Sequence, residues 1–316
     1  MIGQSPNFLR AVALLARFAE SGAPVLIQGE TGTGKEMAAR FVHYRSGRHD
    51  KPFVPVNCGA LPDTLIENEL FGHAQGAFTD AKRDIPGLVE LAHAGTLFLD
   101  EIDSLSPRAQ VVLLRFLQDH SYRPLGGRRE ENADVRIITA SNRSLPDLAA
   151  GGRFRADLLF RINILTVELP PLRERAGDIE LLAERFIADC AHRYRKPPKT
   201  LSPRALDSLA AYSWPGNIRE LENRIHREFL LADGPVIDFA REPGAEPSSS
   251  ASPSTYVAAR NHALDDFHRQ YLTGLLRRSH GNVTQAAREA GKERRALGKL
   301  VKKYGIAVDA LRNDRP

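Results

Sequence analysis

The stretch Gly29-Glu30-Thr31-Gly32-Thr33-Gly34-Lys35-Glu36 follows a short apolar run at residues 24–28 and precedes a segment of helix-forming composition at 37–42. A strand, a glycine-rich turn and a helix in this order are the context in which GxxxxGK is a phosphate-binding loop. The glycines let successive backbone N–H groups face one anion at the positive end of the helix dipole, and Lys35 can reach the β- and γ-phosphates. The stretch therefore predicts a nucleoside triphosphate site.

A second nucleotide signature lies at residues 96–101, where an apolar strand ends in Asp100 and Glu101. Asp100 suits a magnesium ligand beside the phosphates. Glu101 suits a general base that polarises the attacking water. Glu36 stands where the general motif has a Ser or Thr that holds magnesium, so metal coordination must depend more on other residues. The two signatures together predict nucleotide hydrolysis.

Three more apolar runs, at residues 53–57, 136–142 and 164–169, read as strands, and helical segments separate them. This order predicts an α/β fold with a doubly wound, five-stranded parallel sheet. A proline in the first of these runs favours an edge position. Asn57 and Asn142 end two of the strands, where α/β sheets place ligand groups. Asn142 either orients water and senses the γ-phosphate or is an ordinary turn residue.

Residues 178–194, 203–212 and 214–231 have helical patterns and predict a small all-helical lid beside the sheet. Arg219 lies near the start of the last helix, where it either leans over the phosphates or pairs with a neighbouring glutamate.

Arg155 and Arg161 lie between the last two strands and are six residues apart, so they diverge on a helix. Each is either an ordinary surface arginine or an arginine finger supplied to a neighbouring subunit's nucleotide.

The composition is that of a chain with two or three domains, since 316 residues can bury a substantial core. No run approaches the roughly 20 apolar residues of a membrane span, and the start lacks a secretory signal, so we expect a cytoplasmic protein. Cys58 and Cys190 lie far apart without metal-ligand spacing and are expected to be buried thiols rather than a disulfide or zinc pair.

The C-terminal residues are basic. Residues 257–316 hold thirteen lysines and arginines against six acidic residues, although the whole chain carries only +5. This asymmetry indicates a contact with nucleic acid, the alternative being a solvated basic tail. Residues 240–256, rich in Pro, Ser, Gly and Glu, read as a flexible linker. Helical patterns at 264–276, 283–290 and 292–304 around a glycine turn predict a helix-turn-helix; a three-helix dimerisation bundle is the alternative.

Several separated motifs resemble the sigma-54-dependent transcriptional activators (bacterial enhancer-binding proteins), and the likeness covers residues 2 to about 231. The motifs are the Glu-containing phosphate loop, Val56-Asn57-Cys58, Glu69-Leu70-Phe71-Gly72-His73, residues 95–101, Phe154-Arg155-Ala156-Asp157-Leu158, residues 169–175 and Trp214-Pro215-Gly216-Asn217-Ile218-Arg219-Glu220-Leu221. The resemblance implies a ring-forming AAA+ ATPase, usually a hexamer, that binds ATP and Mg²⁺ at subunit interfaces.

The same resemblance implies roles for single residues. Asn57 would hold Glu101 in its switch position, Asn142 would be the first sensor and Arg219 the second. Arg155 and Arg161 would be the trans-acting fingers. The nucleotide-binding set is then Gly29, Glu30, Thr31, Gly32, Thr33, Gly34, Lys35, Glu36 and Arg219.

Residues 281–306 resemble the Fis-type DNA-binding domain that ends these activators. The resemblance implies binding to double-stranded DNA at an upstream activator site, with dimerisation through this domain. Its major-groove residues would be Glu293, Arg294, Arg295 and Lys299, and its phosphate contacts Lys302 and Lys303.

The family grips sigma-54 RNA polymerase with a loop that reads GAFTGA. Here the loop is Gly76-Ala77-Phe78-Thr79-Asp80-Ala81, with Asp80 in place of the second glycine. Asp tolerates left-handed backbone better than most residues, so the turn can survive, but a carboxylate at the tip can weaken docking on sigma or select a different partner. The preferred function is ATP-driven activation of sigma-54 polymerase. The alternatives are a DNA-binding regulator that uses nucleotide only to oligomerise, favoured by Asp80, and a remodelling or replication motor, which this loop disfavours.

The expected organisation is an ATPase subdomain at 1–171, a helical lid at 172–239, the linker at 240–256 and the DNA-binding domain at 257–316. Because the ATPase motifs begin close to Met1, we expect no sensing domain ahead of them in this chain.

Overall fold

The chain forms two units, Met1–Ala240 and Arg241–Pro316, which are described separately. The computed structural model describes residues 1–239 except Thr64 and Asp80, and then Leu272, Leu275, Leu276, Ser279, residues 282–290 and residues 294–303. Asp80, Glu293 and the expected linker at 240–256 therefore lie outside the described residues.

A five-stranded parallel sheet forms the centre of the first unit, in the order β2-β5-β8-β1-β9. This confirms the expected fold, and β2 lies at an edge, as its proline indicated. The strands are β1 (Val25–Gln28), β2 (Phe53–Asn57), β5 (Thr96–Asp100), β8 (Arg136–Ser141) and β9 (Leu165–Glu168).

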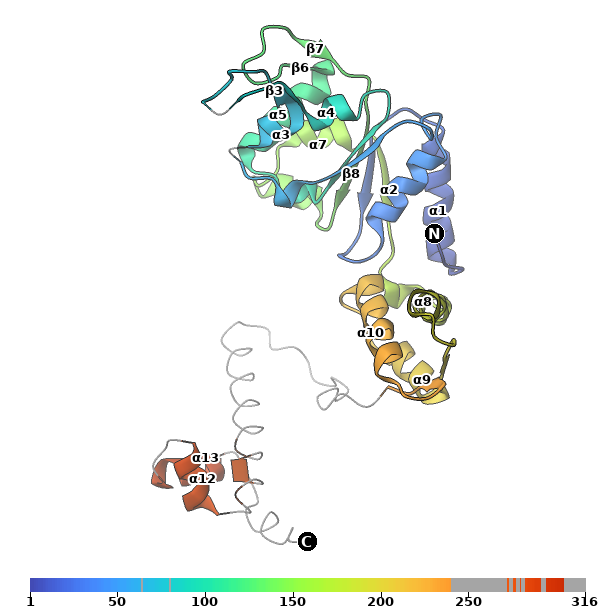
Figure 1. The fold of residues 1–316 in the computed structure, drawn as a ribbon, viewed down its shortest axis with the longest axis vertical. Coiled ribbons are helices and arrows are strands. Elements are labelled where there is room, and N and C mark those ends of the chain that lie inside the picture. The colour runs from blue at the N-terminus through green and yellow to red at the C-terminus, as the bar shows by residue number, and fades with distance from the viewer. Residues whose placement is uncertain are drawn as a thin grey trace. The chain divides into compact units, whose positions relative to one another are not determined.

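Helices cover both faces of the sheet (Figure 1) because successive side chains of the central strands point to opposite sides. Leu26 and Ile137 belong to one buried cluster, and Val25 and Ile138 belong to the other. The first cluster is covered by α3 (Ile66–Phe71), α4 (Leu88–Leu91), α5 (Pro107–Asp119), α6 (Leu145–Ala150) and α7 (Ala156–Ile162), and the second by α1 (Pro6–Ala19) and α2 (Lys35–Tyr44).

Two small antiparallel hairpins extend from the unit, and the sequence predicted neither. They pair β3 (Gly72–His73) with β4 (Ile85–Pro86) and β6 (Ser121–Tyr122) with β7 (Glu131–Asn132). Backbone bonds join them, because Leu125 donates to the Gly72 carbonyl and accepts from Ala74 N, each at 2.9 Å. The helix α3, which leads directly into the first hairpin, begins at Ile66.

The lid packs three helices, α8 (Asp178–Tyr194), α9 (Pro203–Ala211) and α10 (Asn217–Leu231), around the fully buried Trp214. The Trp214 indole donates to the Leu209 carbonyl at 2.9 Å, which satisfies its one polar atom. A short parallel pair, β10 (Thr200–Leu201) and β11 (Val236–Ile237), closes the lid.

A buried ion pair between Arg175 and Asp178 ties the start of the chain to the lid. Both side chains are at most 1% exposed, and Arg175 Nε lies 2.8 Å from Asp178 Oδ2. Asp178 also accepts from Gln4 N at 2.6 Å, from Ser5 N at 3.0 Å and from the Ser5 hydroxyl at 2.9 Å. Arg175 Nη2 donates to the Ile2 carbonyl at 2.8 Å. The residues before α1 are therefore held at the root of the lid.

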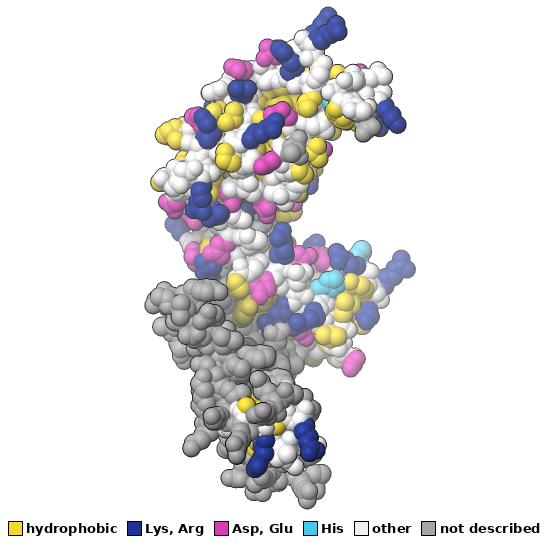
Figure 2. All heavy atoms as spheres, turned by 90° about the vertical axis from the view of Figure 1, so that its left-hand side faces the viewer, with side chains coloured by type: hydrophobic (Ala, Val, Ile, Leu, Met, Phe, Trp, Pro, Cys, Tyr) yellow, Lys and Arg dark blue, Asp and Glu magenta, His cyan; other side chains and the backbone are white. Residues whose placement is uncertain are grey.

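The second unit contains α12 (Val283–Glu289) and α13 (Arg294–Lys303), which pack through Ala286, Ala287, Leu297 and Val301. Both helices lie where the sequence predicted them, but the turn between them lies outside the described residues, so the helix-turn-helix stays a prediction. The charged side chains described here, Arg288 and Arg294, are exposed, and the charged groups of this unit visible in Figure 2 are dark blue.

Within the part of the chain that the structure describes, no helix is both long enough and apolar enough to cross a membrane. Cys58 and Cys190 are free and buried, as expected.

Candidate nucleotide site

The expected site residues meet at the carboxyl edge of the sheet. In the parallel register Gln28 stands beside Ser141, and Asn57 stands beside Asp100. The phosphate loop leaves β1 at this edge, the carboxylates leave β5, and Asn142 follows β8. This is where open α/β sheets bind ligands.

A cleft of about 340 Å³ lies between the phosphate loop, the end of β5 and the start of α10. It brings together nine of the expected site residues, and Gly29, Glu30 and Thr33 are not among its lining. The lining residues are Thr31, Gly32, Gly34, Lys35, Glu36, Met37, Asp100, Glu101, Asn142, Ile218, Arg219 and Glu222.

The phosphate loop needs glycine where the lid approaches it. Gly32 has φ +81°, and a Cβ placed there would lie 2.2 Å from the Gly216 carbonyl oxygen. Gly34 has φ +95° and precedes α2 directly. Both glycines thus adopt backbone conformations that other residues rarely adopt. The loop they shape leads directly into the first turn of α2, whose backbone amides can face an anion.

Lys35 is buried at the base of the cleft, with 8% of its surface exposed. Its Nζ donates to the carbonyls of Gly29 at 2.9 Å and Glu30 at 3.1 Å. Burial lowers the pKa of Lys35, and the carboxylates of Asp100, Asp103 and Glu101 oppose that shift. One lysine facing three carboxylates is suited to phosphate oxygens and a cation.

Glu101 occupies a sharp turn, with left-handed backbone at φ +53°. Its N–H donates to Asp100 Oδ1 at 2.9 Å. Non-glycine residues in this conformation are rare and concentrate at functional sites. The left-handed turn thus marks Glu101 as a candidate functional residue directly after the buried strand.

Asn57 and Glu101 approach the same glycine. Asn57 Oδ1 accepts from Gly59 N at 2.8 Å. A Cβ at Gly59 would lie 3.2 Å from Asn57 Oδ1 and 2.8 Å from Glu101 Oε2. The direct hold of Asn57 on Glu101 therefore stays a prediction, while their proximity is a feature of the structure.

The side chains of Glu36 and Thr33 are engaged within their own segment. Glu36 pairs with Arg40 one turn on, at 2.7 Å, and Thr33 donates to the Glu30 carbonyl at 2.8 Å. Because the Glu36 carboxylate and the Thr33 hydroxyl already have these partners, Asp100, which lines the cleft, is the better-placed metal ligand.

Sequence reasoning missed Asp103. It lies in the 3₁₀ turn Ile102–Ser104, and its Oδ1 accepts from the Ser141 hydroxyl at 3.0 Å and from Asn142 N at 3.3 Å. Asp103 thus fixes Asn142 beside the carboxylates. A third acidic residue two positions after Glu101 was the available signal.

Arg155 and Arg161 do not line the cleft of their own chain. Arg155 pairs with Asp157 through two bonds, of 3.0 and 2.6 Å, at the surface. Arg161 donates to the Leu117 and Gln118 carbonyls at 2.9 and 3.1 Å. Any role in hydrolysis must therefore be toward another copy of the chain.

The buried Gln110, which sequence reasoning also missed, holds the backbone before α7. Its Oε1 accepts from Arg155 N at 2.8 Å, and its Nε2 donates to the carbonyls of Leu105 at 2.9 Å and Arg153 at 3.1 Å. Gln110 therefore links the turn that follows Glu101 to Arg155.

Backbone hydrogen bonds join described residues of the loop between β3 and β4. Gly76 N donates to the Ala81 carbonyl at 2.9 Å, and Ala81 N donates to the Phe78 carbonyl at 3.0 Å. The Phe78 ring rests 4.8 Å from the His73 ring, yet 47% of the Phe78 surface stays exposed. The loop thus presents an aromatic side chain from a defined base.

Comparisons with known proteins agree with this geometry. Residues 1–168 match the family described as "Sigma-54 interaction domain", and residues 173–252 match "AAA+ ATPase lid domain". Transcriptional regulatory protein GlrR of Escherichia coli K12 is 44% identical over 97% of this chain and 68% of its own length. Transcriptional regulatory protein ZraR of Salmonella typhimurium is 43% identical over 94% of this chain and 67% of its own length.

A solved structure extends the likeness to three dimensions. NtrX from Brucella abortus in complex with ADP superposes with a TM-score of 0.73 and 32% identity, over 97% of this chain and 69% of that one. The present chain thus spans about two thirds of the length of these relatives.

Proposed function

Because the chain belongs to the sigma-54-dependent transcriptional regulators and is an AAA+ ATPase, we propose that it hydrolyses ATP between neighbouring copies to drive open-complex formation by sigma-54 RNA polymerase. The observation that carries the proposal is the convergence of Lys35, Asp100 and Glu101 on one cleft, while Phe78 is exposed on a loop of the same unit.

In this proposal Lys35 and the amides at the start of α2 bind the phosphates. Glu101 polarises the attacking water, and Asn142, fixed by Asp103, orients it. The described residues contain no cluster of three metal-ligating side chains, and Mg²⁺ is typically held by one or two carboxylates together with phosphate oxygens. Asp100 fits this role, and the ion would neutralise charge on the phosphates.

The neighbouring copy supplies cationic groups to the same reaction. Arg155 directly precedes α7 and Arg161 lies within it, and neither lines the cleft of its own chain. Between them Phe160 is 80% exposed, the most exposed of the large apolar side chains described. An apolar side chain of this exposure between two arginines fits a contact with a second copy, as in a ring, usually a hexamer.

Phe160→Ser is expected to impair assembly without weakening the fold, because the side chain contributes little to the core of its own chain. We expect the specific ATPase rate to fall by about tenfold or more at low protein concentration and to recover partly at high concentration. Light scattering and turnover across a dilution series measure this. Leu231→Ser, at a residue 68% exposed on the lid, is the matched control. Concentration-independent turnover in Phe160→Ser would contradict the proposal.

The loop at residues 76–81 is proposed to contact sigma-54. The contact would use Phe78 and Thr79 at its tip, with Gly76, Ala77 and Ala81 shaping the turn. Asp80 adds a carboxylate to the same contact. Hydrolysis would move the loop through the segment 57–71, which runs from the Asn57 end of β2 to the base of the loop.

Phe78→Ala is expected to reduce open-complex formation by at least about tenfold, the size of a typical hot-spot truncation, while ATP turnover stays within about threefold. The Phe78 ring packs on His73, but nearly half of its surface is exposed, so its removal should cost little stability. Reconstituted transcription from a sigma-54 promoter measures the effect. Leu91→Ala, at an exposed apolar residue on α4, is the control.

The same assay tests the whole proposal. ATP should support open complexes and a non-hydrolysable analogue should not. A protein that hydrolyses ATP yet never supports open complexes would refute sigma-54 activation, and Asp80→Gly would then show whether the loop carboxylate is the cause.

The second unit is proposed to bind double-stranded DNA and to dimerise. In this proposal Glu293, Arg294, Arg295 and Lys299 reach base edges and Lys302 and Lys303 reach phosphates. The supporting observations are the basic composition of α13 and its packing on α12 through Leu297 and Val301, which uses one side of the helix for the core.

A further inference from the structure

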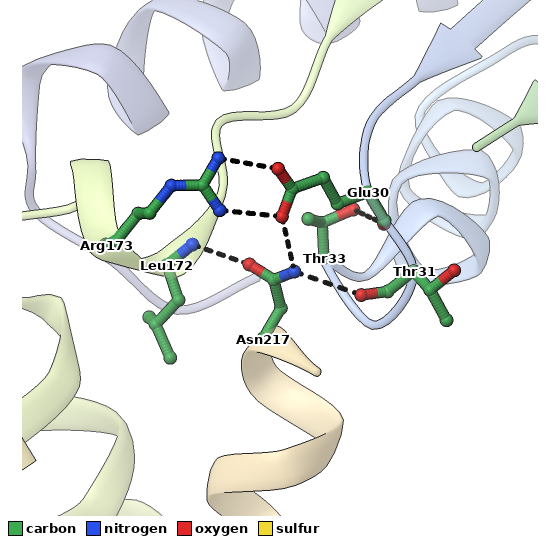
Figure 3. Close-up of polar contacts among 6 residues, drawn as sticks. All are labelled: Glu30, Thr31, Thr33, Leu172, Arg173 and Asn217. Carbon is green, nitrogen blue, oxygen red and sulfur yellow. Dashed lines mark hydrogen bonds and ion pairs between the residues drawn. The ribbon is translucent and has the colours of Figure 1, made fainter. Parts of the chain in front are cut away.

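The Glu30 side chain points from the phosphate loop to the lid, not into the nucleotide cleft (Figure 3). Arg173, in the 3₁₀ turn Leu172–Glu174, donates to both carboxylate oxygens, at 2.8 and 2.6 Å. Two parallel N–H···O bonds fix the angle between the groups as well as their distance. These bonds lower the pKa of Glu30 to about 2, with help from Asn217, so the carboxylate is ionised at neutral pH.

Asn217 is the third member of this network, and all the hydrogen-bonding capacity of its amide nitrogen is used. Its Nδ2 donates to Glu30 Oε2 at 3.1 Å and to the Thr31 carbonyl at 3.0 Å. Its Oδ1 accepts from Leu172 N at 2.7 Å. The residue is fully buried and adopts left-handed backbone, φ +52°, which Asn tolerates better than most residues. A buried amide that joins its own helix to two other segments specifies one arrangement of the three.

The backbone continues the contact on both sides of Asn217. Ile218 N donates to the Gly32 carbonyl at 3.0 Å. Gly216 lies so close to Gly32 that no side chain fits there. Glu30 and Thr31 are therefore joined to Asn217, and Gly32 is joined to Ile218, the two residues that precede Arg219.

We propose that Glu30, Arg173 and Asn217 form a clamp that fixes the phosphate loop against the lid and thereby sets Arg219 over the phosphates. They are positioning residues, since none of their side chains lines the cleft. The inference rests on the proposed use of ATP. An isolated surface ion pair would contribute little, because Glu30 and Arg173 are each more than 40% exposed, but the buried Asn217 makes the pair part of one network.

The expected signature is weaker nucleotide binding with little change in the chemical step, because the clamp holds the loop alike in the ground state and in the transition state. Glu30→Gln keeps the shape but loses the charge, and we expect ADP affinity to fall and the KM for ATP to rise by about three- to tenfold. The kcat should stay within about twofold.

Asn217→Asp is the sharper variant, because Asp also tolerates left-handed backbone but replaces the N–H donor with a carboxylate oxygen that faces Glu30. We expect more than about a tenfold loss of ADP affinity. The double variant Glu30→Gln/Asn217→Asp rebuilds the bond with reversed polarity, since the amide introduced by Glu30→Gln can donate to the new carboxylate, and it should recover part of the loss.

The readouts are ADP binding by calorimetry, steady-state ATPase kinetics and Trp214 fluorescence on the full chain. Trp214 is the one tryptophan of the sequence and is buried in the lid, so unchanged emission shows that the lid is folded. Arg185→Gln, which breaks an exposed pair with Asp189 on α8, is the control and should change nothing.

Wild-type affinity in Glu30→Gln, or a double variant no better than Asn217→Asp alone, would overturn the clamp. Should Asn217→Asp fail to fold, Glu30→Gln still decides the matter. A wild-type chain that binds ADP but never turns over ATP would refute the proposed hydrolysis and leave the clamp to be judged by ADP affinity.

Discussion

Glu101→Gln is expected to lower kcat for ATP hydrolysis by about 10²–10⁴-fold, the usual contribution of a positioned general base. The amide keeps the size of the side chain and its left-handed turn but cannot accept the proton of the attacking water. Because Lys35 and the phosphate loop are untouched, ADP affinity should stay within about twofold. Single-turnover hydrolysis and calorimetry on the full chain measure the two quantities.

Glu184→Gln makes the same chemical change at an exposed position on α8 and should have no effect. Retained turnover in Glu101→Gln would assign the base to another group, whereas a large loss of ADP affinity would show that Glu101 serves binding instead.

Asp178→Asn is expected to cost about 3–5 kcal/mol of unfolding free energy, the usual result of removing one partner of a buried ion pair. The variant leaves Arg175 charged and 1% exposed, and it weakens the hold on Gln4 and Ser5. Urea unfolding followed by circular dichroism measures the loss. Asp189→Asn, in an ion pair with both partners more than half exposed, is the control and should cost less than about 1 kcal/mol.

The loss in Asp178→Asn should depend on pH. Burial alone would raise the pKa of Asp178, but hydrogen bonds from Gln4, Arg175 and Ser5 hold it below its ordinary value. A carboxyl with a depressed folded pKa contributes stability above its unfolded pKa of about 4, and the contribution is lost as pH falls through the folded pKa. The gap between wild type and Asp178→Asn should therefore narrow below about pH 4. A gap that is constant down to about pH 2 would contradict this account.

Local sequence predicted the sheet well because the strands are mainly apolar runs, each of which ends in a polar residue. Residues 96–101 show this most clearly, with Asp100 and Glu101 directly after the buried strand. The two hairpins were not predicted because two-residue strands such as β3 and β6 are too short for an alternating pattern. They form because Leu125 bonds the base of one to the other, which is a tertiary effect.

The residues of the phosphate loop were predictable because the motif itself fixes their spacing. The residues that bind this loop from distant parts of the chain were not predictable. Arg173 lies 143 positions from Glu30, and Asn217 lies 187 positions away, so no local pattern reports the contact. Gln110 is hidden in the same way, since a glutamine within a helix reads as a solvent-facing residue until its burial is known.

The short turn at Leu172–Glu174 carries arginines that reach in two directions. Arg173 donates to Glu30 of the phosphate loop, and Arg175, which directly follows the turn, donates to the Ile2 carbonyl. The turn therefore connects the residues before α1 to the phosphate loop through side chains that are two positions apart. We therefore expect a change in the position of residues 2–5 to reach Glu30 through this turn, without any contact at the nucleotide cleft.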